Sequence, residues 1–123
     1  MRSRKTQQLL FAARLIHAAV VAGSPARRRC LCDETVHVFK AADHSEALKH
    51  TLKIGRDLEH TYNNSRGQAV AWRFVEVVAV TEIRGNVLGK EVSSRLFDKT
   101  FTQRVTLRTK FHPERSKPQW SVA

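Results

Sequence analysis

Histidine, cysteine and carboxylate side chains could give this chain a chemistry, but their spacing assembles no recognisable centre. His44 and His50 lie six residues apart on an expected helix, which places them on opposite faces of it. Cys30 and Cys32 are separated by one residue and lack the second ligand pair of a tetrahedral zinc site. The sequence contains no HExxH pattern, no nucleophile elbow and no glycine-rich phosphate loop. We therefore expect no metal, no cofactor and no catalytic residue, and we interpret the histidines as surface or half-buried packing residues.

Phosphate contact is the second chemistry that the composition suggests, because the formal net charge is +11. Residues 1–32 carry +7, residues 33–97 carry nine charges of each sign, and residues 98–123 carry +4. Attraction of these ends to phosphate would supply affinity without sequence specificity and would weaken with salt. The alternative is solvated, partly disordered ends that keep the protein soluble. The candidate phosphate-contacting residues are Arg27, Arg28, Arg29, Arg104, Arg108 and Lys110.

A third group of candidates surrounds residues 62–80, where a polar turn leads into a run of Val, Trp and Phe. Asn and Gly tolerate the backbone angles of a tight turn, and β-branched and aromatic residues favour a strand. Aromatic residues and Arg dominate the hot spots of protein interfaces, so this region is a candidate partner surface. In the structural alternative, Asn64 and Gly67 shape the turn, and Trp72 fills the core under a helix. Arg95 then pairs with an acid. The candidate partner-surface residues are Tyr62, Trp72, Arg73 and Arg95.

The strands that would position these candidates follow from hydrophobic alternation and turn residues. The spacing of apolar residues in the first segment is compatible with a helix or a strand. Its Ala content favours a helix, whereas the family resemblance described below favours a strand. An exposed arginine loop precedes the second strand. The third strand changes its buried face midway, which indicates a bulge near Phe74 and Val75 or burial of both faces. The last is a candidate edge strand with one basic face. Strands are expected over residues 11–21, 35–41, 70–80, 91–97 and 101–111.

One helix is expected between the second and third strands. Asp43 is a suitable N-cap, and Glu46 three residues later completes a pattern similar to a capping box. An apolar stripe then runs from Ala47 to Leu58. Gly55 interrupts this helix at a cost of roughly 1 kcal/mol relative to Ala, so we expect it to pack closely against a sheet.

The order of these motifs resembles a bacterial family known as domain of unknown function 4288. FAARLI, DETVHVFKAADHSEAL and GKEVSSRLF are similar to its first strand, its second strand with the helix start, and its closing strand. The signature Tyr-x-Asn-x-x-Gly-x-x-Val-x-Trp-x-Phe-Val is matched by Tyr62, Asn64, Gly67, Val70, Trp72, Phe74 and Val75. The resemblance covers roughly residues 11–97 and implies a compact α+β fold. It implies no reaction, since no activity is established for the family.

The expected fold is therefore α+β, in the order β-β-α-β-β. It has a small antiparallel sheet of four strands, or five with the C-terminal one, and one helix packed on a face. Residues 1–10 are expected to form a basic N-terminal extension, and residues 11–97 a single domain. Residues 98–123 are expected to form a basic C-terminal extension, with an edge strand followed by a disordered tail.

The leading functional expectation is a non-enzymatic binding domain whose partner is another protein or a second copy of the chain. The alternative is a nucleic-acid-associated protein that uses the basic residues named above, and the third possibility is an uncharacterised enzyme. No apolar run approaches the ~20 residues of a membrane span, so we expect no membrane partner. Cys30 follows three arginines that could lower the pKa of its thiol. The two cysteines are otherwise typical of reduced thiols in a cytoplasmic protein.

Overall fold

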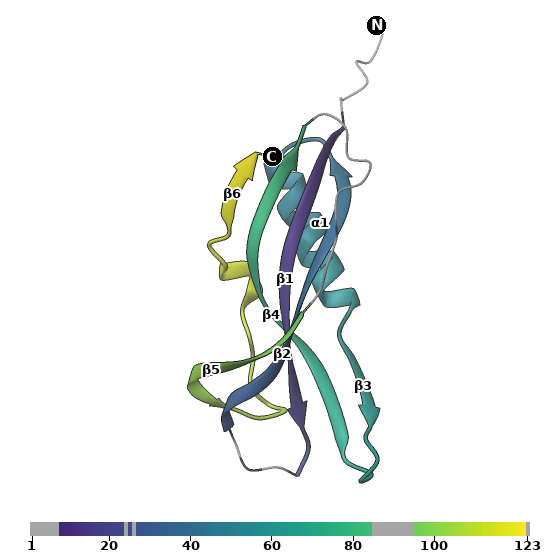
Figure 1. Cartoon of the computed structure of the whole chain (residues 1–123), viewed down its shortest axis with the longest axis vertical. Helices are drawn as coiled ribbons and strands as arrows, with labels where there is room; N and C mark the ends of the chain where they lie inside the picture. Colours follow the sequence, from purple (N-terminus) through teal and green to yellow (C-terminus); the bar gives the residue numbers. More distant parts are fainter. Residues whose placement is uncertain (1–7, 24, 26, 85–94, 123) are drawn as a thin grey trace, which may run out of the picture.

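The computed structural model describes residues 8–23, 25, 27–84 and 95–122, and over these residues it shows a six-stranded sheet with one α-helix (Figure 1). The elements are β1 (Leu9–Val21), β2 (Arg27–Ala41), α1 (His44–Asp57), β3 (His60–Asn63), β4 (Ala69–Ile83), β5 (Arg95–Val105), the short 3-10 helix η1 (Pro113–Arg115) and β6 (Gln119–Val122).

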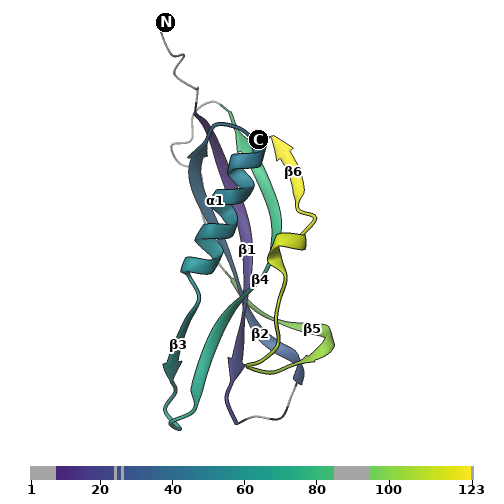
Figure 2. The same ribbon diagram turned by 180° about the vertical axis from the view of Figure 1, so that it is seen from behind.

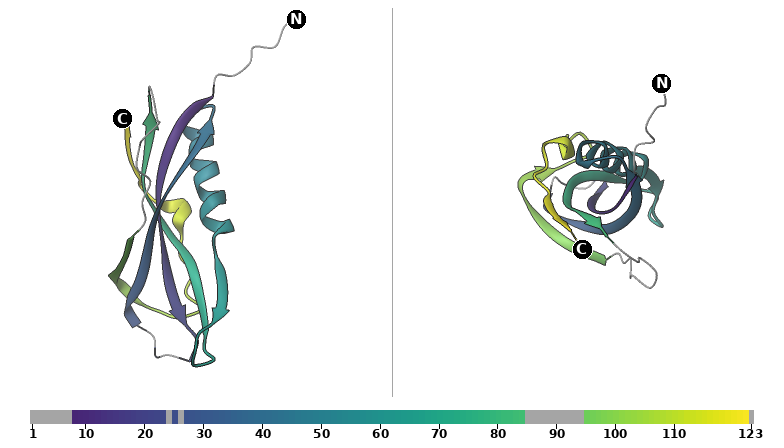
Figure 3. Two further views of the ribbon diagram at one scale, coloured as in Figure 1. Left: turned by 45° about the vertical axis from the view of Figure 1, so that its right-hand side comes forward. Right: turned by 90° about the horizontal axis from the view of Figure 1, so that it is seen from above.

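β1 is the central strand of the sheet, because it pairs with β2 on one side and with β4 on the other. The strand order is β3-β4-β1-β2-β5, and all of these neighbours are antiparallel. β6 lies off this path and pairs in parallel with the last part of β4. The sheet is strongly twisted, so that its strands cross one another in Figure 3.

The two faces of the sheet bury separate cores. α1 covers one face at the end where β1 begins and β2 finishes (Figures 1 and 2). Over the opposite face, Phe101 of β5 and Phe111 of the following segment lie with their ring centres 5.6 Å apart and pack against the second core. The core beneath α1 contains Phe11, Ala13, Leu15, Ala41, Ala47, Phe74, Val77 and Val80, and the second core contains Ile16, Ala18, Val20, Cys30, Cys32 and Val105.

The outer edge of β4 is completed by two short strands and two side chains. β3 pairs with its first residues and β6 with residues 79–82. Between them, the backbone N–H of Phe74 donates to Glu59 Oε2 at 3.1 Å, and that of Val77 donates to Ser116 Oγ at 2.9 Å. Side-chain oxygens therefore take the place of a missing strand, which satisfies donors that an exposed edge would leave open.

The expected fold of four or five strands in the order β-β-α-β-β was wrong. The sheet has six strands and dominates the structure, with β3, β4, β5 and β6 following the helix. β3 and β6 are four residues long and all of their residues are exposed, so they carry no buried alternating face that a periodicity argument could detect. The expected arginine loop was also wrong, because Arg27 and Arg29 lie in β2 and pair with β5.

Two further expectations were confirmed. Residues 11–21 form a strand, as the family resemblance implied, and Asp43 caps α1 by accepting a hydrogen bond from the backbone N–H of Glu46 at 2.8 Å. The Glu46 carboxylate pairs with His50 at 3.4 Å instead of completing a capping box. The register between β1 and β4 shifts twice, passing over Val75 and Val78. The expected bulge near residues 74–75 is the first of these shifts. Of the fourth expected strand, residues 91–94 lie outside the described part, and β5 begins at Arg95.

Gly55 packs closely against the sheet, as its position in the helix predicted. A Cβ atom built on Gly55 would lie 2.2–2.5 Å from ring atoms of Phe74, much closer than real carbon contacts allow. Phe74 is only 3% exposed and belongs to the core beneath α1, so its ring has little room to move aside. The glycine is therefore required by the approach of the helix to β4.

Replacing Gly55 by Ala should lower the free energy of unfolding, although Ala is the better helix former by about 1 kcal/mol. Overpacking of a core typically costs about 1–3 kcal/mol, so a net loss is expected in urea denaturation. Lys49→Ala, at an exposed helix position, is the matched control and should change little. Adding Phe74→Leu to Gly55→Ala should cost less than the two separate losses combined. A Gly55→Ala protein as stable as the parent would contradict this account of the packing.

Candidate functional site

The end of the sheet beyond α1 has one face without a helix over it. α1 ends at Asp57, and the chain continues along β3 beside the first part of β4 (Figure 1). In this region Trp72 of β4 is the register partner of Ala19 in β1 and of His60 in β3. His17 of β1 is the register partner of Phe74 in β4 and of Asp33 in β2. Residues paired in this way point to the same side of a sheet. We call this surface the open face, and it contains His17, Leu31, Asp33, Leu58, His60, Tyr62 and Trp72.

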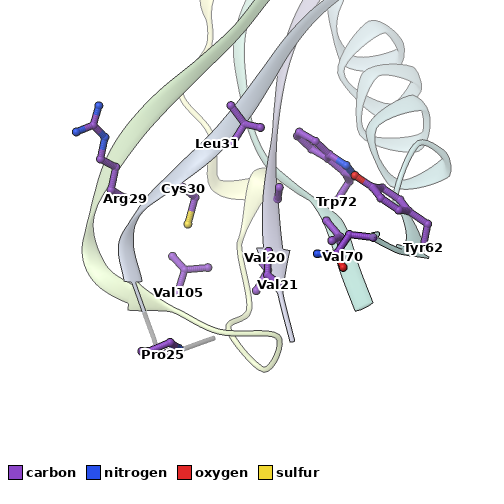
Figure 4. Close-up of a pocket in the computed structure, with 12 residues that line it drawn as sticks. Val20, Val21, Pro25, Arg29, Cys30, Leu31, Tyr62, Val70, Trp72 and Val105 are labelled. Atoms are coloured by element: carbon purple, nitrogen blue, oxygen red, sulfur yellow. The ribbon is translucent and has the colours of Figure 1, made fainter. Parts of the chain in front are cut away.

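An apolar hollow of about 340 Å³ lies at the far end of the open face (Figure 4). Figure 4 shows Trp72 and Tyr62 along one side and Cys30 and Val105 along the other, with Leu31 projecting between them. The hollow thus lies where the open face meets the second core. We call it the apolar hollow.

A second hollow of about 440 Å³ lies nearer to α1, and three histidines and a carboxylate contribute to its lining. It shares Tyr62 and Trp72 with the apolar hollow, so the two aromatic side chains border both. Its volume is within the range typical of small-molecule sites. We call it the histidine hollow, and its lining consists of His17, Asp33, Thr35, His37, Leu58, His60, Tyr62 and Trp72.

The three histidines of the histidine hollow are each held by a hydrogen bond. His17 is buried, and its Nε2–H donates to the backbone oxygen of Gly55 at 2.8 Å. His60 donates from Nδ1 to the backbone oxygen of Leu58 at 2.9 Å. His37 Nε2 lies 2.8 Å from Thr35 Oγ1. Because carbonyl oxygens only accept, His17 and His60 in their neutral forms keep one ring nitrogen as an acceptor.

Burial lowers the pKa of His37 from its ordinary value of 6.5, and the neighbouring His17 lowers it further. Asp33 acts in the opposite direction but is the smallest of the three influences. His37 therefore stays neutral in the folded protein at neutral pH. The hollow is lined by a carboxylate, neutral imidazole at His37, a hydroxyl and two aromatic rings.

The turn between β3 and β4 holds Tyr62 and Trp72 in place. Asn64 Oδ1 accepts hydrogen bonds from the backbone N–H groups of Arg66 and Gln68, each at 3.0 Å. Gly67 has a φ of 74°, a left-handed conformation that favours glycine. The structural interpretation of Asn64 and Gly67 is thus confirmed. Trp72 does not fill the core under the helix: it is half-buried beyond the helix end, and Phe74 takes that place.

The four candidate partner-surface residues do not form one surface. Tyr62 and Trp72 lie together on the open face. Arg73 follows Trp72 in the strand and points to the other side, where it bonds the Leu107 backbone oxygen at 2.9 Å and pairs with Glu59. Arg95 pairs in register with Glu34, but its side chain lies outside the described part.

The basic candidates are also dispersed. Arg29 borders the apolar hollow and pairs with Asp98 at 3.0 Å, while Arg27 and Arg28 are in β2 with side chains outside the described part. The strand expected to reach residue 111 ends at Val105, because a turn follows in which Thr106 and Thr109 bond each other's backbone. Arg104 is therefore on β5, whereas Arg108 and Lys110 lie beyond it, and all three are exposed.

Cys30 and Cys32 are both buried and form no disulfide with any residue of the described part. Burial, together with the neighbouring Cys30, raises the pKa of the Cys32 thiol to about 11. Cys32 is thus a packing residue of the second core. The arginines before Cys30 do not make this pair a reactive centre at the surface.

The residues that the sequence did not single out as a site are His17, Asp33, His37 and His60. A signal for three of them was available in the alternation of the first two strands. A hairpin of residues 9–21 with residues 27–41 places His17 opposite Asp33 and Ala13 opposite His37, all on one face. His60 could not be found in this way, since it belongs to a strand of four exposed residues.

Within the described ranges, no three His, Cys, Asp or Glu side chains come together in a way that could hold a metal ion. No helix in the part of the chain that the structure describes has the length and apolarity needed to cross a lipid bilayer.

The chain belongs to the family described as Domain of unknown function (DUF4288), whose sequence profile matches residues 10–94. This confirms the resemblance drawn from the motifs. No curated protein and no solved structure matches the chain. All residues of the histidine hollow fall within the matched range, whereas Arg104, Arg108 and Lys110 fall outside it.

The free energy of unfolding should decrease as the pH is lowered, because folded His37 takes up a proton less readily than His37 in the unfolded chain. The folded pKa is below 6.5, so the unfolded chain takes up this proton first as the pH decreases. Stability is therefore full above the unfolded pKa and is lost as the pH falls below about 6.5 toward the folded value. Urea denaturation between pH 7.5 and 5 should show this slope, and His37→Gln should flatten it. His112→Gln, which removes an exposed histidine, is the control. Equal slopes in the His37→Gln variant and the parent would refute the assignment.

Proposed function

We propose that this protein is a non-enzymatic binding domain that docks another protein on the open face. The observation that carries the proposal is the exposure of large apolar side chains there. Tyr62 is 47% exposed, Leu31 44% and Leu58 41%, and they flank the half-buried Trp72. Aromatic residues beside a preformed hollow are typical anchors of protein interfaces.

The edge strand β3 supports the same proposal. Its four residues are exposed, and it pairs with β4 on one side only among the described residues. An extended segment of a partner can add to such an edge through backbone hydrogen bonds, with its side chains entering adjoining hollows. Tyr62 belongs both to this edge and to both hollows, so the two modes of contact would reinforce each other.

The partner is proposed to be a different protein and not a second copy of the chain. Two copies would each carry a formal charge of +11 and would repel one another. We place the interaction in the cytoplasm, which suits two buried thiols that form no disulfide in the described part.

Replacing Tyr62 by the photo-crosslinking residue p-benzoylphenylalanine should trap the partner as an adduct of one defined mass in the native host. The same replacement at Leu107, which is 38% exposed and lies near Arg73 on the other side of the sheet, should not. Leu31→Glu should abolish the Tyr62 adduct, because it places a charge in the apolar hollow.

Two results of the crosslinking would overturn the proposal. An adduct that persists with Leu31→Glu would show contact unrelated to the open face. An adduct at twice the mass of the chain would show that the partner is a second copy of the chain and not a different protein.

A second candidate function is binding of nucleic acid through the basic segment after β5. Arg104, Arg108 and Lys110 are exposed and form no ion pair with any described residue, and Arg115 and Lys117 extend the series. Exposed cations without partners are available to phosphates. This surface lies outside the family match, so such binding would belong to this chain and not to the family.

Binding to a 20-nucleotide single strand and to a duplex should be measured by fluorescence anisotropy at low salt. Affinity should fall by at least tenfold between about 50 and 200 mM salt and should drop in the variant Arg108→Glu with Lys110→Glu. Arg66→Glu, at an exposed turn position, should bind like the parent. Absence of binding at 50 mM salt would exclude this function.

A further inference from the structure

We infer that the histidine hollow binds an organic cation, a substituted ammonium or a guanidinium group, held between the carboxylate of Asp33 and the ring faces of Trp72 and Tyr62. This site is independent of the proposed protein docking, because it rests on the chemistry of the hollow and not on the exposure of the face around it.

Asp33 supplies the charge. It is the one Asp, Glu, Lys or Arg residue in the hollow's lining. It is half-buried, and it makes no hydrogen bond or ion pair with another described residue. A half-buried carboxylate attracts a cation that enters beside it more strongly than a fully solvated one does.

The aromatic side chains supply the second part of the recognition. Indole and phenol faces attract cations, and the attraction is strongest for Trp and increases when the cation is desolvated. His60 stacks on Tyr62 with ring centres 6.0 Å apart. Tyr62 and Trp72 both line the hollow that Asp33 also lines.

Hydrogen-bond acceptors complete the site. The donating nitrogens of His17 and His60 are occupied by the backbone oxygens of Gly55 and Leu58. In neutral rings the remaining nitrogens are acceptors, and so are the oxygens of Asp33. N–H groups of a guanidinium or a primary or secondary ammonium match such a lining.

The competing ligand classes fit less well. An anion would need positive charge, but the lining contains no Lys or Arg, and burial lowers the pKa of His37. A metal ion would need three ligands in suitable positions, and the described residues do not offer them. The net charge of +11 acts mostly from exposed side chains, whose fields are screened over about 8–10 Å at physiological salt. The nearby Asp33 carboxylate therefore determines that the hollow favours a positively charged ligand.

The cation can come from a free small molecule or from a Lys or Arg side chain of a docked protein. Both present the same chemistry to the hollow, and both are covered by the inference. They differ in how much of the surrounding face they contact, which an experiment can separate.

The test uses the full chain with Trp120→Phe, which leaves Trp72 as its only tryptophan. Trp120 lies against His44 at the other end of the sheet, with ring centres 5.0 Å apart. Choline should change the Trp72 fluorescence in a saturable way. The neutral isostere 3,3-dimethylbutan-1-ol should bind at least tenfold more weakly. Asp33→Asn should remove the difference in affinity between choline and its neutral isostere. In the Trp72→Phe protein the fluorescence comes from Trp120, and choline should not change it.

A peptide arm identifies the source of the cation. N-acetylated peptides that contain arginine or trimethyllysine are compared with choline in the same titration. Tighter binding of a peptide by tenfold or more supports a protein side chain, and equal or weaker binding supports a free ligand.

Equal binding of choline and its neutral isostere, or no saturable signal from any cation, would overturn the inference. So would competition by acetate or phosphate at equal concentration. The ¹H–¹⁵N spectrum of the unsubstituted protein gives an independent readout, because the Trp72 indole N–H should shift with choline even if Trp120→Phe impairs folding. None of these measurements needs a protein partner, so their failure is distinct from a failure of the crosslinking.

Discussion

The close approach of α1 to β4 at Gly55 is the contact on which the rest of the structure depends. The missing side chain admits the ring of Phe74 beneath the helix. The backbone oxygen of the same residue accepts the hydrogen bond of His17, whose ring stacks on Phe74 with centres 5.2 Å apart. One glycine thus links the core to the first residue of the histidine hollow. The helix ends two residues later, so the same contact sets where the covered part of the sheet stops and the open face begins.

The predictable parts of the fold are those decided within a few residues. The cap at Asp43, the turn at Asn64 and Gly67, and the bulge in β4 each follow from a side chain acting on its neighbouring backbone. The short exposed strands could not be predicted, because β3 and β6 form only through partners on β4. The candidate site was missed in part for the same reason. The register of the first two strands could have brought His17 and Asp33 together, whereas His60 belongs to a short strand that forms only on β4.

The apolar hollow and the histidine hollow of the open face are both bordered by Tyr62 and Trp72. On one side of Tyr62 and Trp72 the lining is aliphatic and continues into the second core. On the other side it includes a carboxylate and three histidines. A ligand that contacts both aromatic rings therefore borders an aliphatic lining and one that contains acceptor groups. This combination favours amphipathic groups over purely apolar ones.

The hydrogen bond from Val77 to Ser116 means that the boundary drawn by sequence similarity differs from the boundary of the folded unit. The family match ends at residue 94, yet Ser116 satisfies a donor of β4, Phe111 packs on the second core, and Val105 is part of that core. Residues contributed from outside the matched range therefore act as a wall of the matched domain. A protein cut at residue 94 would lose Val105, Phe111 and Ser116 together and would expose both the second core and the Val77 N–H group.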